Sequence, residues 1–206
     1  MTRVCLVGNP DTVLQYELLS RETSREALAT YDLRRPFENS IALRTVSVGA
    51  AVSLLNDLNW YLTRFVDEAL VQEPSVSDEE WLSRSLATDL RNGNVEPAET
   101  DEFCKIYGLE RVDGEAGDSS DAKPDATAAT NDAGDSDGTV PTDETGTDSA
   151  SDANSSESAA AGASGPSWRL VEPLYVRRTG GELPTYDLRD VEETLVVRLT
   201  EAEHTP

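Results

Sequence analysis

The chain has 206 residues and a formal net charge of −23, because 40 acidic residues outnumber 17 basic ones. Fifteen of the basic residues are arginine, and the two lysines are Lys105 and Lys123. So acidic a composition argues against a nucleic-acid-binding protein, which needs a basic face. We interpret the acidity, together with the scarcity of lysine, as adaptation to molar salt. A polyanion mimic that binds basic partners is the alternative.

The stretch from Asp113 to Ser167 differs in composition from the rest of the chain. It is rich in Asp, Ser, Ala, Thr and Gly, lacks aromatic residues, and has Lys123 as its single basic residue. Such a segment cannot bury enough apolar surface to offset its chain entropy, so we predict an acidic disordered insertion at 113–167. The segments 1–112 and 168–206 together form one domain, because the second is too short for a core of its own.

Few residues in the sequence can support catalysis. The only histidine is His204, close to the end of the chain, which argues against Ser-His-Asp, Cys-His and most imidazole-based metal sites. Cys5 and Cys104 are far apart in the sequence and predict neither a disulfide scaffold nor a zinc site. Because no secretory signal and no apolar run of membrane-spanning length is present, we expect a cytoplasmic protein that does not bind a membrane. We also expect no cofactor and no metal, because the sequence lacks the motifs and histidines that would hold them.

The first predicted element is a strand over Arg3–Val7, whose continuous hydrophobicity is typical of a central strand. The turn Gly8–Asp11 follows, with Asp11 as the N-cap of a helix that runs to about Ser20. A strand, a glycine turn and a helix N-terminus can hold a phosphate. This turn has one glycine and no Walker or dinucleotide-binding motif, which is more typical of a plain connector.

A hairpin and one long helix are predicted next. Thr30–Arg34 alternates as a half-buried strand does, and Ile41–Val48 supplies the second strand of the hairpin. The segment Ala51–Leu70 then places its apolar residues on one stripe of a helix. Trp60 falls among the polar residues of this helix. We predict that it is buried beneath a neighbouring helix, and an exposed anchor for a partner is the alternative.

The later elements follow from capping and turn signals. Ser77–Glu80 reads as a capping box that opens a helix ending at about Arg91, before the stop signal Asn92-Gly93. A short helix is predicted over Ala98–Tyr107. Beyond the acidic stretch we predict a Gly180-Gly181 turn and three strands, Trp168–Arg178, Thr185–Arg189 and Thr194–Thr200.

Part of the first hairpin recurs near the end of the chain. Tyr31–Arg34 matches Tyr186–Arg189, and Glu38–Arg44 matches Glu192–Arg198. Two equivalent hairpins side by side in one sheet would explain the match, and two hairpins with a similar binary pattern are the alternative. The repeated acids and arginines are expected to form structural ion pairs, namely Asp32 with Arg34 or Arg44 and Asp187 with Arg189 or Arg198.

Four stretches of the sequence, Val4–Asp11, Tyr31–Arg34, Val48–Leu58 and Asp78–Leu82, resemble an uncharacterised haloarchaeal protein family of unknown function. The resemblance covers the folded part of the chain. It implies a halophilic protein and supplies no catalytic residue.

We therefore expect an α+β domain in which a mainly antiparallel sheet of five or six strands packs against the Ala51–Leu70 helix and two or three shorter helices. The leading functional hypothesis is a non-enzymatic interaction or regulatory module that binds a protein partner. The second is a small enzyme or nucleotide-binding protein that uses the Gly8–Asp11 turn with Asp32 or Asp187. The candidate binding residues are Trp60, Arg64, Asp32, Arg34, Asp187, Arg189, Asn9 and Asp11.

Overall fold

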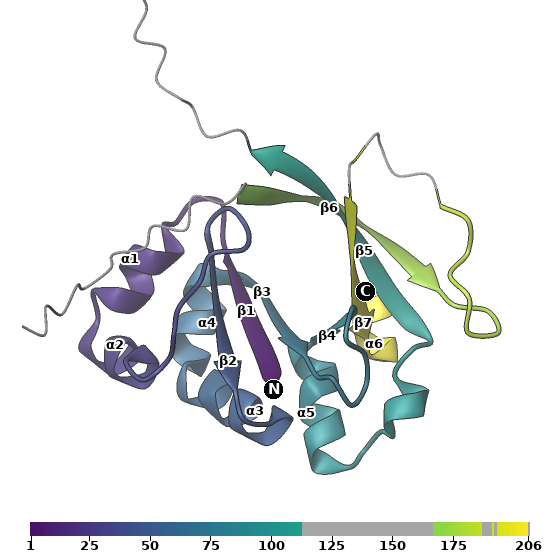
Figure 1. The fold of residues 1–206 in the computed structure, drawn as a ribbon, viewed down its shortest axis with the longest axis horizontal. Coiled ribbons are helices and arrows are strands. Elements are labelled where there is room, and N and C mark those ends of the chain that lie inside the picture. The colour runs from purple at the N-terminus through teal and green to yellow at the C-terminus, as the bar shows by residue number, and fades with distance from the viewer. Residues whose placement is uncertain (113–166, 187–190, 192, 206) are drawn as a thin grey trace, which may run out of the picture. The chain divides into compact units, whose positions relative to one another are not determined.

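The computed structural model describes residues 1–112, 167–186, 191 and 193–205. These residues form one sheet with the strand order β2-β1-β3-β4-β7-β5-β6 (Figure 1). The strands are β1 (Thr2–Gly8), β2 (Ser40–Thr45), β3 (Val66–Gln72), β4 (Trp81–Ser83), β5 (Phe103–Val112), β6 (Ser167–Arg177) and β7 (Glu193–Leu199). All neighbouring strands are antiparallel except the parallel pair β4 and β7. The predicted α+β class with a mainly antiparallel sheet is confirmed, and the described residues form seven strands instead of five or six.

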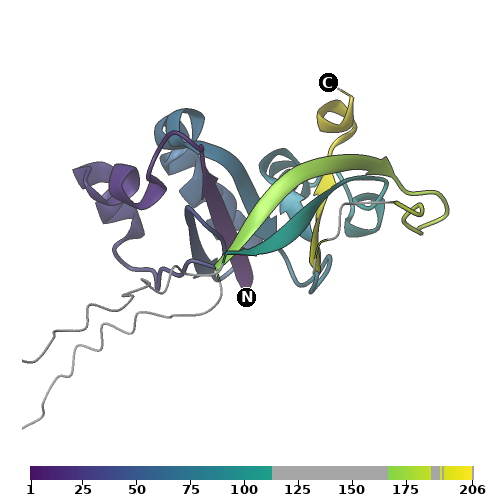
Figure 2. The ribbon, with the colours of Figure 1, turned by 90° about the horizontal axis from the view of Figure 1, so that it is seen from above.

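Six α-helices and one 3-10 turn accompany the sheet in the described part of the chain. They are α1 (Leu14–Leu19), α2 (Glu22–Leu28), α3 (Val48–Asp57), α4 (Asn59–Phe65), α5 (Arg84–Asn92), α6 (Glu201–His204) and the 3-10 turn η1 (Pro97–Glu99). Helices α1 to α4 gather around β1, β2 and β3, whereas β5 and β6 form one long curved ribbon beside β7 (Figures 1 and 2).

The predicted long helix is interrupted at Leu58 and is wrong from Val66 onward. Helix α3 begins after Ser47, whose hydroxyl accepts the N–H of Ala50 at 3.2 Å. The helical path breaks at Leu58 and resumes as α4, and from Val66 onward the chain is strand β3. Strand β3 pairs with β1 along most of its length. This long-range pairing outweighs the local helical spacing.

The predicted helix at Ser77 begins several residues later. The Ser77 hydroxyl accepts the N–H groups of Glu79 and Glu80 but opens only a turn. Residues Trp81–Ser83 form the short strand β4, and the Ser83 hydroxyl caps α5 instead. The predicted stop at Gly93 is confirmed by its left-handed φ of 70°.

The segment predicted as a helix over Ala98–Tyr107 is mostly strand. Only η1 is helical there, and β5 begins at Phe103 between β6 and β7. Cys104, which was expected on that helix, therefore lies in a strand. Pairing on both sides of β5 fixes the extended backbone, and no local signal in the sequence reports that pairing.

Backbone bridges link the two edge strands of the sheet, β2 and β6. Arg34 exchanges two backbone hydrogen bonds with Ala42 of β2, at 2.7 and 2.8 Å. Phe37 bridges Trp168 of β6, and the N–H of Glu38 donates to the Trp168 carbonyl oxygen at 2.6 Å. The sheet is therefore curled, because one short segment joins its first strand to its last.

The hairpin expected before α3 is only partly present. Its second strand is β2, but the strand expected over Thr30–Arg34 is reduced to the bridge at Arg34. At the other end of the chain, β6, β7 and the Gly180-Gly181 turn are confirmed. The predicted strand Thr185–Arg189 lies largely outside the described residues. Strands β2 and β7 are separated by β1, β3 and β4, so the second strands of the two repeats are not side by side.

The curled sheet carries a hydrophobic core on each face. On the outer face, side chains of β1, β2, β3 and β4 pack against α1 to α5. On the inner face, side chains from both halves of the sheet meet, and this cluster of buried residues comprises Cys5, Phe37, Leu70, Trp81, Tyr107, Leu109, Leu195, Val197 and Leu199. The C-terminal strands are thus part of the same hydrophobic core as the front of the chain.

Candidate functional site

A cavity of about 750 Å³ opens where β1 ends and β3 begins. The described residues that line it come from the turn after β1, the segment before β2, β3, β5 and β6. Its polar and charged lining includes Arg35, Glu38, Asn39, Asp67, Glu68, Tyr107, Arg169 and Glu172, and its apolar lining includes Val7, Pro10, Val13, Leu170, Val171 and Pro173.

Two polar side chains that line this cavity, Glu68 and Tyr107, meet Lys105 on the inner face. The phenol of Tyr107 donates to Oε1 of Glu68 at 2.6 Å, and Nζ of Lys105 forms an ion pair with the same oxygen. The Lys105 ammonium also lies 5.4 Å from the centroid of the Tyr107 ring. The side chains of Lys105 and Glu68 are 8% and 18% exposed, so this is a largely buried ion pair with a hydrogen-bonded neighbour.

The phenol of Tyr107 stays protonated and acts as a hydrogen-bond donor. Burial raises its pKa most strongly, and the charge of Glu68 and the hydrogen bond to it raise the pKa further. The pKa of the phenol therefore lies far above its ordinary range. Tyr107 is thus suited to holding a carboxylate in place, and it is not suited to acting as a phenolate base at neutral pH.

Lys105, Glu68 and Tyr107 were not among the site residues predicted from the sequence. Both segments that carry these residues were predicted to be helices. That prediction gave no reason to expect their side chains to meet on one face of a sheet. One signal was available: Lys105 is one of only two lysines in a chain that otherwise uses arginine. A lysine kept among arginines points to a position where a compact ammonium is required.

The Gly8–Asp11 turn does line the cavity, but it does not form a phosphate site. Helix α1 has six residues and its N-cap is Val13, so Asp11 does not cap it. The Asn39 side chain accepts the N–H of Leu14 at 2.8 Å and donates to the carbonyl oxygens of Asn9 and Thr12. An intramolecular contact therefore takes one of the amides that would bind an anion.

Trp60 is half-exposed, which corrects the prediction that a neighbouring helix covers it. The guanidinium carbon of Arg64 lies 4.5 Å from the centroid of the Trp60 ring, and that of Arg21 lies 5.7 Å from it. Arg21 also stacks on Phe65 at 5.1 Å. We call these four side chains, Arg21, Trp60, Arg64 and Phe65, the Trp60 surface.

The predicted site residue Asn9 supports this surface from behind. Its side-chain amide donates to the carbonyl oxygen of Arg64 at 3.0 Å, and its backbone N–H donates to that of Phe65 at 3.0 Å. Three of the predicted binding residues, Asn9, Trp60 and Arg64, therefore lie together. Sequence spacing alone could not show this, because the contact joins the first turn of the chain to the end of α4.

The other predicted binding residues do not join them. Asp32 pairs with Arg34 at 3.1 Å, as expected, and both side chains are well exposed and do not line the cavity. Asp187 and Arg189 lie outside the described residues. Arg198, proposed as one possible partner of Asp187, pairs with Glu80.

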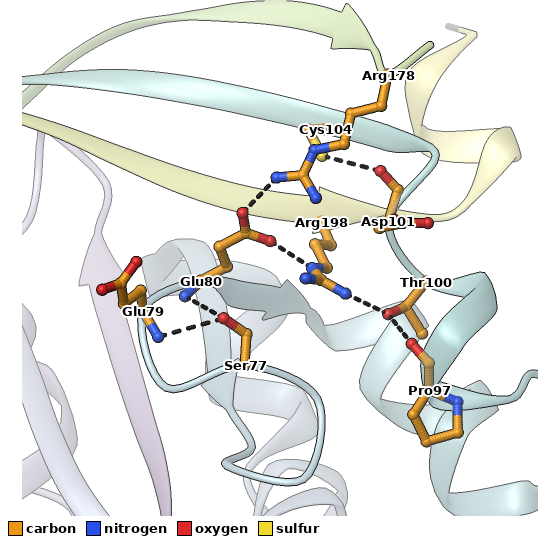
Figure 3. A network of polar contacts seen from close by, with 9 residues as sticks. All are labelled: Ser77, Glu79, Glu80, Pro97, Thr100, Asp101, Cys104, Arg178 and Arg198. Atoms are coloured by element: carbon orange, nitrogen blue, oxygen red, sulfur yellow. Dashed lines mark hydrogen bonds and ion pairs between the residues drawn. The ribbon is translucent and has the colours of Figure 1, made fainter. Parts of the chain in front are cut away.

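Glu80 forms a buried ionic network that ties β7 and the end of β6 to the loop before β4 (Figure 3). Its carboxylate binds both Arg178 and Arg198, and Arg198 also donates to the hydroxyl of Thr100 at 2.8 Å. Burial by itself raises the pKa of the Glu80 carboxyl, but the two arginines outweigh it and hold the pKa below its ordinary value. All three charged side chains are less than one-fifth exposed, which fits a structural role.

The described residues offer little further chemistry. They contain no group of histidine, cysteine, aspartate and glutamate side chains arranged to hold a metal ion. None of the helices in that part of the chain is both long and apolar enough to cross a membrane.

The fold defines an α+β protein whose curled sheet encloses a polar cluster, and its sequence places it in a known family. A model of a family of unknown function, DUF5804, matches residues 2–109, so the chain belongs to that family. The match spans β1 to most of β5 and includes the Trp60 surface together with Glu68, Lys105 and Tyr107. No curated protein and no solved structure matches the chain. The expected membership of an uncharacterised family is confirmed.

Proposed function

We propose that this protein is a non-enzymatic interaction module that works in a cytoplasm of molar salt and binds an acidic segment of a protein partner through the Trp60 surface. One observation carries the proposal. The Trp60 indole is 50% exposed and lies beneath the guanidinium of Arg64 on the outside of α4.

The composition of the Trp60 surface is that of a binding hot spot. Tryptophan and arginine are the residues most enriched among interface positions that dominate binding energy. Neighbouring side chains hold Trp60 in place. Its ring contacts those of Tyr61 and Phe65 edge to face, at centroid distances of 5.0 and 6.1 Å, and Arg21 also packs against it. A pre-ordered side chain loses less entropy when a partner covers it.

The charges of this surface favour an acidic occupant. Arg21 is paired with Glu17 at 2.8 Å, but within the described residues no carboxylate pairs with Arg64. A guanidinium that stacks on an indole still directs its N–H groups outward in its own plane. A carboxylate in that plane can accept two hydrogen bonds from it. A partner segment with a carboxylate next to an apolar side chain fits this arrangement.

The position of Asp32 favours this proposal over the small-enzyme alternative. That alternative requires the Gly8–Asp11 turn and Asp32 or Asp187 to converge on one pocket. Asp32 is exposed, pairs with Arg34 and does not line the cavity.

The proposal is tested by affinity purification of tagged protein from its source cells in molar KCl. Wild type is compared with Trp60→Ala, with the charge reversal Arg64→Glu, and with Tyr175→Ala, a matched control for an exposed aromatic residue on β6. We expect one protein to co-purify with wild type and with Tyr175→Ala, and to be lost with Trp60→Ala and Arg64→Glu. In the reciprocal experiment, with the tag on that partner protein, this chain should co-purify with the partner. Equal recovery with all four forms, or recovery with none, would contradict the proposal.

The salt part of the proposal has its own test. A protein adapted to molar salt gains stability as KCl is raised, because salt screens the repulsion among its carboxylates. The measurement is the urea concentration at the unfolding midpoint in dilute and in molar KCl. A midpoint that stays the same or decreases as KCl is raised would contradict the proposed adaptation to salt.

A further inference from the structure

We propose that the cavity at the end of β1 binds a small organic cation, a primary amine or guanidine on a short aliphatic body. This site is separate from the Trp60 surface. The proposal rests on the cavity, on the hydrogen bonds that Glu68 makes and leaves unmade, and on the charges around it.

Glu68 lines the cavity and has an unused acceptor oxygen. Tyr107 and Lys105 both bind its Oε1, and within the described residues no hydrogen bond or ion pair involves Oε2. A carboxylate has about four lone-pair sites, so its second oxygen can accept bonds from a ligand. Because Lys105 and Tyr107 fix the carboxylate from one side, the free oxygen is held in place before any ligand arrives.

The charges that line the cavity favour a cation over an anion. Glu38 is neutralised by Arg169 at 2.6 Å, and Glu68 is neutralised by Lys105. After these two ion pairs, the charged lining residues that remain are Arg35, Asp67 and Glu172. Among the described residues, the lining therefore carries an excess of one negative charge. Arg35, Asp67 and Glu172 are all exposed, so salt screens this excess and amine binding should weaken as the salt concentration is raised.

The remaining lining suits the aliphatic part of such a ligand. Val7, Pro10 and Leu170 are among the apolar residues on the wall, and the volume of about 750 Å³ lies within the range of roughly 300–1,000 Å³ typical of small-molecule sites. A compound that carries one charged end and a short alkyl chain can place its ammonium on the carboxylates while its chain contacts this wall.

The proposal is tested by isothermal titration calorimetry of the full chain with n-butylguanidine and with n-pentylamine, and with n-pentanol and glutarate as a neutral and an anionic comparison. Glu172→Gln removes one lining carboxylate from an exposed position and is not expected to disturb folding. Glu79→Gln, which lies outside the cavity lining, is the matched control.

We expect one molecule of amine to bind per chain, with affinity reduced about tenfold, or 1.4 kcal/mol, by Glu172→Gln and unchanged by Glu79→Gln. The neutral and anionic compounds should not bind. Absence of amine binding, equal binding of pentanol, or identical affinity in Glu172→Gln would each overturn the proposal. Trp60→Ala should bind the amine normally, so failure of this site and failure of the Trp60 surface are distinguishable.

Discussion

Tyr107 on β5 and Glu68 on β3 form a 2.6 Å hydrogen bond although two other strands separate theirs in the sheet. In the strand order β4 and β7 lie between them, so this contact crosses the inside of the curl instead of running along it. The contact therefore depends on the C-terminal strands that complete the curl, which lie beyond the family match.

Replacing Lys105 with methionine should destabilise the fold by about 3 kcal/mol, because it leaves the largely buried Glu68 without its counter-ion. The double variant Lys105→Met with Glu68→Gln should recover much of this loss, since a neutral amide can still accept the Tyr107 hydrogen bond. Urea unfolding of the two single variants and the double variant measures the coupling. Additive losses would show that the ion pair does not stabilise the fold.

Replacing Glu80 with glutamine should destabilise the protein by about 3 kcal/mol at neutral pH, since Arg178 and Arg198 would lose their shared carboxylate. The arginines lower the pKa of Glu80 in the folded state below its ordinary value of 4.5. This carboxylate therefore stabilises the fold above that pH, and the contribution is lost as pH falls through the folded-state pKa.

The measurement is the difference in unfolding free energy between wild type and Glu80→Gln across acidic pH. It should stay constant above about pH 5 and shrink below it. Glu79→Gln is the control, because its side chain is exposed and lies off the network in Figure 3. A difference that does not vary with pH would contradict this assignment.

Both cysteines should resist thiol reagents in the folded protein. Burial raises the pKa of Cys5 to about 12 and is the main cause that raises that of Cys104 to about 11. Neither side chain is exposed, and the thiolate is the reactive form. Titration with a chromogenic disulfide at pH 8 should therefore detect no thiol until urea is added. Rapid modification of either cysteine without denaturant would show that its strand opens.

The sequence predicts the elements whose signals are local and misses those fixed by distant pairing. Strand β1, the stop at Gly93 and the Gly180-Gly181 turn follow from apolar runs and glycine positions. Helix α3 follows from its apolar stripe. By contrast, β3 and β5 were assigned to helices, because only pairing with strands far away in the sequence makes those segments extended.

The candidate sites were predictable to a similar degree. Trp60 could be singled out because an indole among polar helix positions is unusual, although its exposure depended on where the later helices pack. Its contact with Asn9 needed the tertiary structure. Glu68 and Tyr107 carried no signal, since an acid and a tyrosine are ordinary until the curl of the sheet brings them together.

The most direct test of the interaction proposal is site-specific photocrosslinking in the source cells, with a benzophenone amino acid placed at Thr63, three residues after Trp60 on α4, or, as control, at Tyr175. Both positions are exposed, so both probes are accessible and Trp60 itself is kept. We predict one cross-linked protein from position 63 and not from position 175, and its loss when Arg64→Glu is added. No cross-linked species at position 63, or the same species from both positions, would contradict the account.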